Sequence, residues 1–264
     1  MITLDTFEQE LKRVRNKAPL VVCITNHVVT NFTADALLAI GAKPFMSESS
    51  EEIEEVSLKA DALLINIGTL TQEQKKLISL AIAAAQKHNI PWVLDPVGAG
   101  FTSYRRQFCR ELIESGCPSL IKGNPSEIDA LCLGELTSIG TDSTICTTSV
   151  KKQAEILAQK KGCIVALSGK KDIITNGWKS VEILNGTPEL TNISGSGCIL
   201  GAIAAAFLVG SSQPLSSVEA AFLLENIAGE LAQRNFHGYG SFKMALLDEL
   251  SHPSAKDYFN RIKQ

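Results

Sequence analysis

Several features that mark other classes of protein are missing from this 264-residue sequence. It has no run of roughly 18 consecutive apolar residues, so we expect no membrane span. Its seven cysteines include no Cys-x-x-Cys pair and lack zinc-ligand spacing, which indicates reduced, mostly buried thiols in a cytoplasmic protein. The formal net charge of −3 gives no reason to expect nucleic acid as a partner.

Known nucleotide-binding signatures are also absent. The sequence contains neither G-x-x-x-x-G-K-[ST] nor the H-R-D and D-F-G motifs, which excludes P-loop kinases and protein kinases. The first twenty residues resemble a charged amphipathic helix without the apolar segment of a secretory signal.

We find no long linker, low-complexity tract or internal repeat, so residues 1–264 are expected to form one domain. The polar stretch at residues 134–149 is the expected mobile loop.

What the sequence does contain is an alternation of short apolar runs and longer helical stretches. Apolar runs of this length are typical of strands buried on both faces of a sheet. Strands separated by helices predict a largely parallel central sheet with helices on both faces, an α/β fold. Asn176-Gly177 between two further apolar runs predicts an antiparallel hairpin. The predicted strands are 21–25, 62–67, 92–95, 119–121 and 163–167, and the helices are 28–40, 51–59, 72–88, 103–115, 125–133, 150–161 and an apolar, buried one through 208.

Small and polar residues follow each of the predicted parallel strands. In open α/β sheets, ligands bind at the carboxyl ends of the strands, so these segments are expected to form one site. They are Thr25-Asn26-His27, Gly68-Thr69, the stretch from Asp95 to Gly100, the stretch from Lys122 to Glu127, and Ser168-Gly169.

The segment Gly195-Ser196-Gly197-Cys198 at the start of the buried helix is the sharpest of the chemical motifs. Its glycines allow close backbone approach, and the free amides and dipole of a helix start favour a phosphate group. Such donors can stabilise the charge that develops on a transferring phosphoryl group. A glycine-rich turn that only caps the helix is the alternative interpretation.

Phosphoryl transfer from ATP requires Mg²⁺, and Asp95 and Glu127 are the candidate residues to bind it, with Asn124 in the same group. An Asp-Pro turn and a helix N-terminal charge are the respective alternatives. Lys122 and Ser168 could contact phosphate groups, although a surface charge and turn chemistry explain them as well.

Taken together, these segments resemble the hydroxyethylthiazole kinase family. The resemblance runs in order along nearly the whole chain, through Cys23-Ile24-Thr25-Asn26, Asn31-Phe32-Thr33-Ala34, Asn66-Ile67-Gly68-Thr69-Leu70, residues 94–100, residues 122–128 and Gly195-Ser196-Gly197-Cys198. It implies a single ribokinase-like domain that uses ATP and Mg²⁺ to phosphorylate 4-methyl-5-(2-hydroxyethyl)thiazole. It also implies a homotrimer with the thiazole site at a subunit interface.

The resemblance further assigns roles to residues. The thiazole pocket would be lined by Asn26, Val28, Met46, Gly68 and Gly195. ATP would contact Lys122, Ser168 and Asn124, and Asp95 and Glu127 would act on the metal side, through water. Gly195, Gly197 and Cys198 would form the catalytic segment. The family more often has Arg and Thr where this chain has Lys122 and Ser168, and lysine lacks the bidentate fork of arginine.

Cys198 stands where the wider ribokinase-like group usually has Asp, the base for the acceptor hydroxyl. A thiol with a pKa of about 8.5 is mostly neutral at pH 7. Because phosphoryl transfer depends mainly on positioning and charge stabilisation, we expect Cys198 to position the hydroxyl and to give modest base catalysis. A small core residue is the alternative.

Three other functions share these features. One is a kinase for another acceptor, such as a pyrimidine or pyridine alcohol. Another is a lyase that uses ATP to dehydrate a hydrated nicotinamide nucleotide, although the segments around Asn26 and Met46 argue against its larger substrate. The last is a thiazole or thiamine sensor that consumes no ATP. A fold alone does not choose among them.

Overall fold

The computed structural model describes residues 2–133, 147–234 and 236–263. In this part of the chain, eight strands form one sheet in the order β2-β1-β3-β4-β5-β6-β7-β8. From β2 to β6 in this order, neighbouring strands pair in parallel, whereas β7 pairs antiparallel with both β6 and β8. The strands are β1 (Leu20–Ile24), β2 (Lys43–Met46), β3 (Ala62–Asn66), β4 (Trp92–Asp95), β5 (Leu120–Gly123), β6 (Ile164–Leu167), β7 (Asp172–Thr175) and β8 (Ser180–Ile183).

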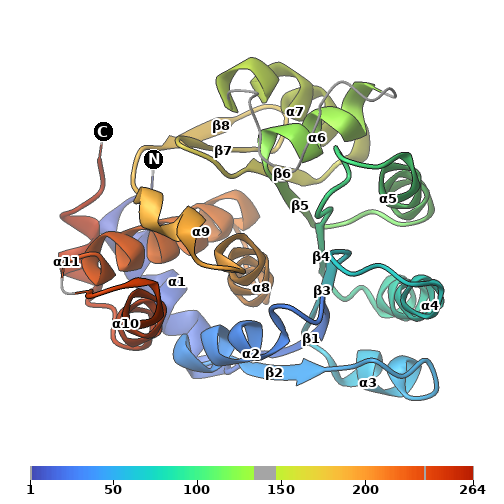
Figure 1. Cartoon of the computed structure of the whole chain (residues 1–264), viewed down its shortest axis with the longest axis horizontal. Coiled ribbons are helices and arrows are strands. Elements are labelled where there is room, and N and C mark those ends of the chain that lie inside the picture. The colour runs from blue at the N-terminus through green and yellow to red at the C-terminus, as the bar shows by residue number, and fades with distance from the viewer. Residues whose placement is uncertain (1, 134–146, 235, 264) are drawn as a thin grey trace.

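Helices cover both faces of this sheet (Figure 1). Residues of the first group of helices share one apolar cluster, and residues of the second group share the other. The first group is α1 (Leu4–Lys17), α2 (Thr30–Ala39), α8 (Ser196–Leu208), α9 (Pro214–Ala232), α10 (Tyr239–Ser251) and α11 (Ala255–Phe259). The second is α3 (Ile53–Lys59), α4 (Gln72–His88), α5 (Ser103–Ser115), α6 (Pro125–Leu133) and α7 (Thr147–Lys161). A short 3₁₀ helix, η1 (Pro188–Asn192), precedes α8.

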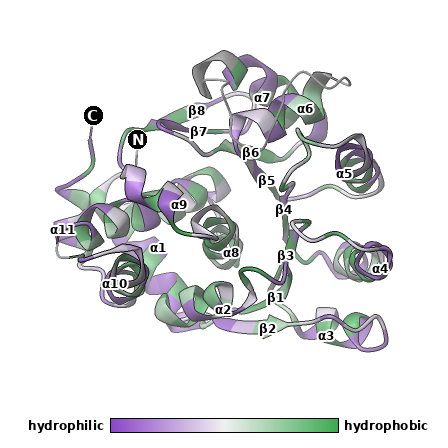
Figure 2. Ribbon diagram, in the orientation of Figure 1, coloured by the Kyte–Doolittle hydropathy of each residue, from purple (hydrophilic) through white to green (hydrophobic). Residues whose placement is uncertain are grey.

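Helix α8 lies between the sheet and the outer helices of its layer. Every residue from Ile199 to Leu208 is buried, because the helix contacts β3 and β4 on one side and α2 and α9 on others. The outer helix α4 is amphipathic by contrast, and Figure 2 shows hydrophobic and hydrophilic colours on its two sides. The burial of α8 predicted from its sequence is confirmed, and its start is held at the carboxyl ends of the central strands.

The structure confirms the predicted α/β sheet and the hairpin, in which Gly177 adopts a φ of +87°. One strand was not predicted: β2, with sequence KPFM, pairs only with β1 at the sheet edge. Its Pro44 and mixed burial hide the usual strand pattern, and proline is tolerated mainly on edge strands. Most of the loop expected at residues 134–149 lies outside the described residues. None of the described helices is long and apolar enough to cross a membrane.

Candidate active site

Three neighbouring parallel strands end in polar side chains that form a hydrogen-bonded chain. Asn66 at the end of β3 donates through Nδ2 to Asp95 Oδ2 at 2.7 Å, at the end of β4. Asn26, just after β1, donates through Nδ2 to Asn66 Oδ1 at 2.9 Å and lies 3.6 Å from Cys198 Sγ. All three polar side chains are buried. The sheet therefore brings the start of α8 into one polar network with β1, β3 and β4.

Lys122 joins this network from β5. Its Nζ lies 3.6 Å from Asp95 Oδ1 and donates to the carbonyl oxygen of Gly197 at 2.7 Å. Burial raises the pKa of Asp95, although Lys122 and Asn66 oppose the shift. The pKa of Lys122 lies above its usual value: burial alone lowers it, but neighbouring anionic groups, Asp95 first, outweigh the burial. A buried cation thus links the Asp95 carboxylate to the first turn of α8.

Glu127 holds two loops with its carboxylate. Its Oε1 accepts from the amide of Gly98 at 2.9 Å, and its Oε2 accepts from the amide of Asn124 at 2.8 Å. Asn124 Oδ1 in turn accepts from the amide of Glu127 at 2.9 Å. Burial, followed by the nearby Asp95, raises the pKa of Glu127 to about 7. Both carboxylate oxygens therefore already serve to position the loops after β4 and β5.

Arg105, on α5, joins the loop after β4 to the loop after β3. It donates to the carbonyl oxygen of Val97 at 2.8 Å and to that of Gly68 at 2.6 Å. Sequence reasoning did not single out this residue, because an arginine on an amphipathic helix resembles a surface charge.

The backbone at the start of α8 requires glycine. Gly195 has a φ of +97°, in the left-handed region, and a Cβ there would lie 2.6 Å from Val29 Cγ1. The first amide that closes a helical bond is that of Ile199, which donates to Gly195 O at 2.9 Å. The preceding amides, of Ser196, Gly197 and Cys198, belong to the turn whose N–H groups have no acceptor within a helix. This geometry suits an anionic group.

Cys198 is a neutral thiol in this environment. Burial, and secondarily the negative Asp95, raise the pKa of Cys198 to about 12. Lys122 opposes these two effects without offsetting them. The thiol is therefore suited to placing a neighbouring group rather than to removing a proton from it.

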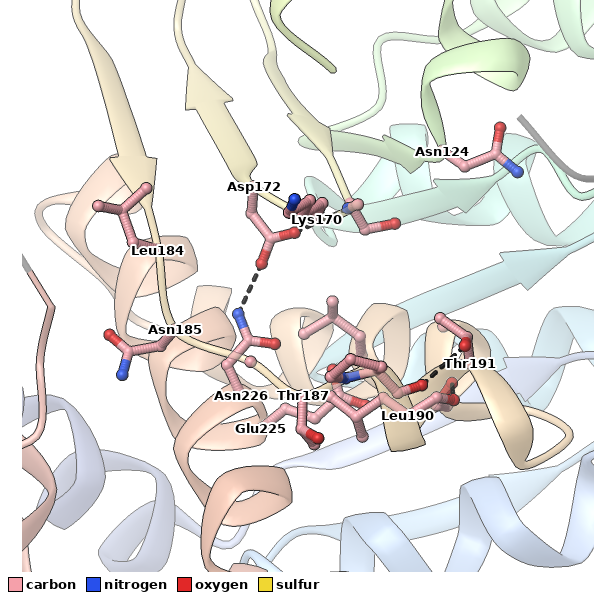
Figure 3. Close-up of a pocket in the computed structure, with 17 residues that line it drawn as sticks. Asn124, Lys170, Asp172, Leu184, Asn185, Thr187, Leu190, Thr191, Glu225 and Asn226 are labelled. Atoms are coloured by element: carbon pink, nitrogen blue, oxygen red, sulfur yellow. Dashed lines mark hydrogen bonds between the residues drawn. The ribbon is translucent and has the colours of Figure 1, made fainter. Parts of the chain in front are cut away.

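A cavity of about 680 Å³ opens beside the start of α8 (Figure 3). Ser196 and Gly197 contribute to its wall, as do Asn124 and Ser168 from the ends of β5 and β6. Lys122 does not line the cavity and lies behind Gly197. The remaining wall comes from the loop between β6 and β7 with the start of β7, from the loop after β8, from η1, from Leu200 of α8 and from Glu225 and Asn226 of α9.

Asn26, Val28 and Gly68, three of the residues assigned to thiazole, lie together beside Cys198 and outside the cavity lining. A Cβ on Gly68 would lie 2.7 Å from the Asn26 side chain, so these two residues are in contact. Val28 donates its amide to Asn26 Oδ1 at 3.1 Å, but its side chain is 70% exposed. Met46, at the end of β2, is half-buried and pairs in register with Cys23 of β1. The binding roles of these residues stay predictions.

The described residues contain no cluster of three or more His, Cys, Asp or Glu side chains that could hold a metal. Mg²⁺ does not need such a cluster, since it usually binds one or two carboxylates together with water and phosphate oxygens. Asp95 Oδ1 fits this role, because no hydrogen bond from the described part of the protein reaches it. Glu127 fits only through water, since backbone amides occupy both of its oxygens.

Besides Arg105, two further groups of site residues had not been assigned a role from the sequence. Asn66, the centre of the polar network, was visible as a polar residue that ends an apolar strand. Glu225 and Asn226 carried no such signal, because polar residues in a long helix usually face solvent. Only the packing of α9 against α8 brings them to the cavity.

Comparison with known proteins defines the class first. A ribokinase-like superfamily protein of Enterococcus faecalis matches the structure with a TM-score of 0.66 over 97% of this chain and 95% of its own, at 15% identity. A hydroxyethylthiazole kinase of Pyrococcus horikoshii matches with a TM-score of 0.90 at 35% identity over 98% of both chains. The fold is ribokinase-like, as the resemblance implied.

The family follows from the sequence comparisons. The model of the hydroxyethylthiazole kinase family matches residues 11–255. A hydroxyethylthiazole kinase of Staphylococcus aureus is 43% identical over 255 residues, which are 96% of this chain and 97% of the relative. The chain belongs to the hydroxyethylthiazole kinase family. It is accordingly an enzyme, a kinase that phosphorylates hydroxyethylthiazole with ATP as the phosphoryl donor.

Proposed function

We propose that this chain transfers the γ-phosphate of ATP to the hydroxyl of 4-methyl-5-(2-hydroxyethyl)thiazole across the first turn of α8. The observation that carries the proposal is the position of that turn between two groups of residues. Ser196 and Gly197 face the 680 Å³ cavity, whereas Gly195 and Cys198 contact Val29 and Asn26 on the other side. ATP would occupy the cavity, and the thiazole alcohol would lie beside Asn26.

On the thiazole side, Asn26, Val28, Met46, Gly68 and the Gly195 backbone would line the pocket. The hydrogen bonds of Asn26 to Asn66 and of Val28 to Asn26 support a pocket whose polar wall is ordered before substrate arrives. On the nucleotide side, Asn124 and Ser168 would contact ATP directly. Lys122 would offset phosphate charge through the Gly197 carbonyl, or directly if ATP draws its ammonium group toward the cavity.

The acceptor hydroxyl would lie near Cys198 Sγ, and the first-turn amides of α8 would receive the γ-phosphate. Because the pKa of Cys198 is about 12, the thiol would orient the hydroxyl and take little part in removing its proton. The preorganised amides would contribute more to the rate than the thiol does, since removing one such donor typically costs a factor of roughly 100 to 1,000 in rate.

Mg²⁺ would be held by Asp95 together with water and ATP oxygens, with Glu127 acting through water. When bound, the ion would neutralise negative charge between the β- and γ-phosphates. Asp95 Oδ1 accepts no hydrogen bond from the described residues and lies 3.6 Å from the Lys122 ammonium group near the start of α8, which supports this assignment.

We further propose a cytoplasmic homotrimer whose subunits meet at the thiazole side. Exposed apolar side chains lie on α2, on α10 and just before α2, which is an arrangement typical of an interface. They are Val28, Leu38, Tyr239 and Met244. Val28 is expected to touch substrate yet is 70% exposed in the single chain, which supports a partner subunit covering it.

The activity test measures coupled ADP release by purified protein with ATP, Mg²⁺ and a panel of heteroaromatic alcohols. The thiazole alcohol should give the highest kcat/KM and a product whose mass corresponds to its phosphate ester. A higher kcat/KM with a pyrimidine or pyridine alcohol would reassign the acceptor. No turnover of any alcohol by folded protein would refute the kinase proposal.

The assembly test measures mass by light scattering during size-exclusion chromatography. The wild type should have three times the mass of one chain, and Leu38→Glu should lower that mass and raise the KM for thiazole. A monomeric wild type that is fully active would contradict the shared site.

A further inference from the structure

The turn between β6 and β7, residues 168–171, forms part of the wall of the cavity beside α8. Ser168 and Lys170 of this turn line the cavity, and Asp172 follows the turn as the first residue of β7. The first residue of the turn is fixed to the sheet, because the amide of Ser168 donates to the carbonyl oxygen of Gly123 at the end of β5 at 2.9 Å. Asp172 holds the turn from its other end.

Asp172 uses its two carboxylate oxygens on two different elements. Its Oδ1 accepts from the amide of Gly169 at 2.8 Å, within the turn. Its Oδ2 accepts from Nδ2 of Asn226, on α9, at 2.6 Å. Figure 3 shows this second bond as a link between the strand end and the helix. One side chain therefore ties the β6–β7 turn to the helix that packs against α8.

The burial of Asp172 distinguishes it from an ordinary turn residue. Turn aspartates usually bond nearby backbone groups in loops at the protein surface. Asp172 is only 4% exposed, and burial raises the pKa of its carboxyl group to about 6, although the Gly169 amide, Asn226 and Lys122 oppose the shift. Burying this charge is unfavourable, and only one of its two hydrogen bonds stabilises the turn itself. The other joins two walls of the cavity.

This link connects segments that a bound nucleotide would contact together. Ser168 lies in one wall of the cavity, and Ser196 and Gly197 of the first turn of α8 lie in another. Both walls are held by α9, since α8 packs against it and the β6–β7 turn reaches it through Asp172. Without the link, the turn could move away from the start of α8. A ligand that contacts both walls would then bind more weakly, because its partners would no longer be preorganised.

We propose that Asp172 is a positioning residue for nucleotide binding, which holds Ser168 in place in the cavity wall by bonding Gly169 and Asn226. The proposal rests on the use of this cavity by ATP and names the residue that keeps the nucleotide wall in position. Asp172 acts through Ser168 and is not itself a ligand of the nucleotide.

The test compares Asp172→Ala with Asp172→Asn by calorimetric titration of ADP, which needs no turnover. Ala removes both hydrogen bonds, so the Ser168 contact should be lost and the Kd for ADP should rise about fivefold to tenfold, the usual effect of one lost hydrogen bond. Asn keeps an acceptor for the Gly169 amide and can donate to Asn226 once that amide group turns its oxygen toward it. The Kd for ADP of Asp172→Asn should therefore stay within about threefold of wild type.

Equal weakening of ADP binding by the two substitutions would overturn the proposal, because it would show that the negative charge matters and not the position of the turn. Kinetics give a second readout, which a purely structural role would not produce. Asp172→Ala should raise the KM for ATP by the same factor as the Kd for ADP, and should leave the KM for thiazole unchanged.

Thr175→Ala is the matched control at the opposite end of β7. Thr175 is also buried, and its Oγ1 accepts from the amide of Gly177 at 3.0 Å in the turn between β7 and β8. It does not line the cavity. Thr175→Ala should lower the Tm and leave the Kd for ADP unchanged. If Asp172→Ala gives this same pattern, Asp172 is a structural residue and the proposal is wrong.

A double variant tests whether Asp172 acts through Ser168. Ser168→Ala alone should raise the Kd for ADP about fivefold to tenfold. In the Ser168→Ala background, Asp172→Ala should raise it further by less than about twofold, because the contact that Asp172 positions is already absent. Effects of the two substitutions that multiply fully would show that Asp172 acts by another route and would overturn the proposal.

The outcomes separate the two proposals. If wild-type protein does not bind ADP, the use of the cavity by ATP is wrong. If wild-type protein binds ADP and Asp172→Ala binds it equally well, only the role of Asp172 is wrong. If Asp172→Ala does not fold, Asn226→Ala, which breaks the same link from α9, replaces it with the same criteria.

Discussion

The two sides of the first turn of α8 are built differently. On the side assigned to thiazole, the polar groups of Asn26, Asn66 and Asp95 hydrogen-bond one another. On the cavity side, Glu225 is buried with an oxygen that no described group reaches. On the thiazole side three buried side chains form one hydrogen-bonded chain, whereas on the cavity side Asn226 bonds Asp172 and leaves Glu225 outside that pair. Changes on the thiazole side should therefore lower both stability and activity. Changes on the cavity side should affect one of these two properties without the other.

Gly195→Ala should have the largest effect, because Gly195 joins the two sides. A Cβ there meets Val29 at 2.6 Å and a φ of +97° disfavours alanine, so the first-turn amides must shift. We expect kcat/KM to fall by roughly 100-fold or more, as for the loss of a preorganised donor.

Gly162→Ala is the control for this change. Gly162 also has a positive φ, +63°, but a Cβ there meets nothing within 4 Å. It should lower stability by about 1 kcal/mol without changing kcat. Equal activity of Gly195→Ala and Gly162→Ala would show that the α8 start is not catalytic.

Asn66→Ala should damage the ordered side next. It removes the donor to Asp95 Oδ2 and the acceptor of Asn26 Nδ2, both buried. Urea unfolding should show a loss of about 2–3 kcal/mol, the cost of unsatisfied buried groups, and kcat should fall about tenfold or more. The Kd for ADP should not change. A weaker Kd for ADP together with normal thiazole kinetics would reverse our assignment of the two sides.

Glu225→Gln should alter the pH dependence of stability. The folded-state pKa of Glu225 is raised from 4.5 to about 8, so wild type loses stability relative to the variant as pH rises between these values. Below pH 4.5 the acid is protonated in both folded and unfolded states, and above about 8 the difference is constant. At pH 8 the variant should be more stable by about 2–5 kcal/mol. Thermal unfolding from pH 4.5 to 9 tests this, and a difference in Tm that does not grow with pH contradicts it.

Substitutions at Cys198 should have the smallest effects. Cys198→Ala should lower kcat by less than about tenfold, because a thiol with a pKa of about 12 contributes little as a base. Cys198→Asp should retain or gain activity, since it introduces a carboxylate where the acceptor hydroxyl is expected. An inactive Cys198→Asp that folds and binds thiazole would show that positioning by the thiol is essential.

Local patterns in the sequence were sufficient for most of the fold and for part of the site. Apolar runs identified the central strands, and Asn176-Gly177 identified the hairpin. The strand ends and the glycines around Ser196 indicated where phosphoryl chemistry belongs. Edge strand β2 escaped prediction because Pro44 and partial burial weaken its pattern.

The contacts between these segments depend on long-range packing. Asn66 stands opposite Asp95 because β3 and β4 pair in parallel register, and no local pattern fixes that register. Arg105 and Glu225 resemble solvent-facing helix charges until α5 and α9 are placed against the rest of the chain.

By itself, the sequence determined the α/β class, the family and the segments that form the site, because these depend on periodicity and on motifs read locally. Only the tertiary structure decided that the α8 start lies between an ordered polar network and a cavity with an unpaired acid. The physical reason is that burial, hydrogen bonding and pKa depend on neighbours far apart in the chain, which only packing brings together.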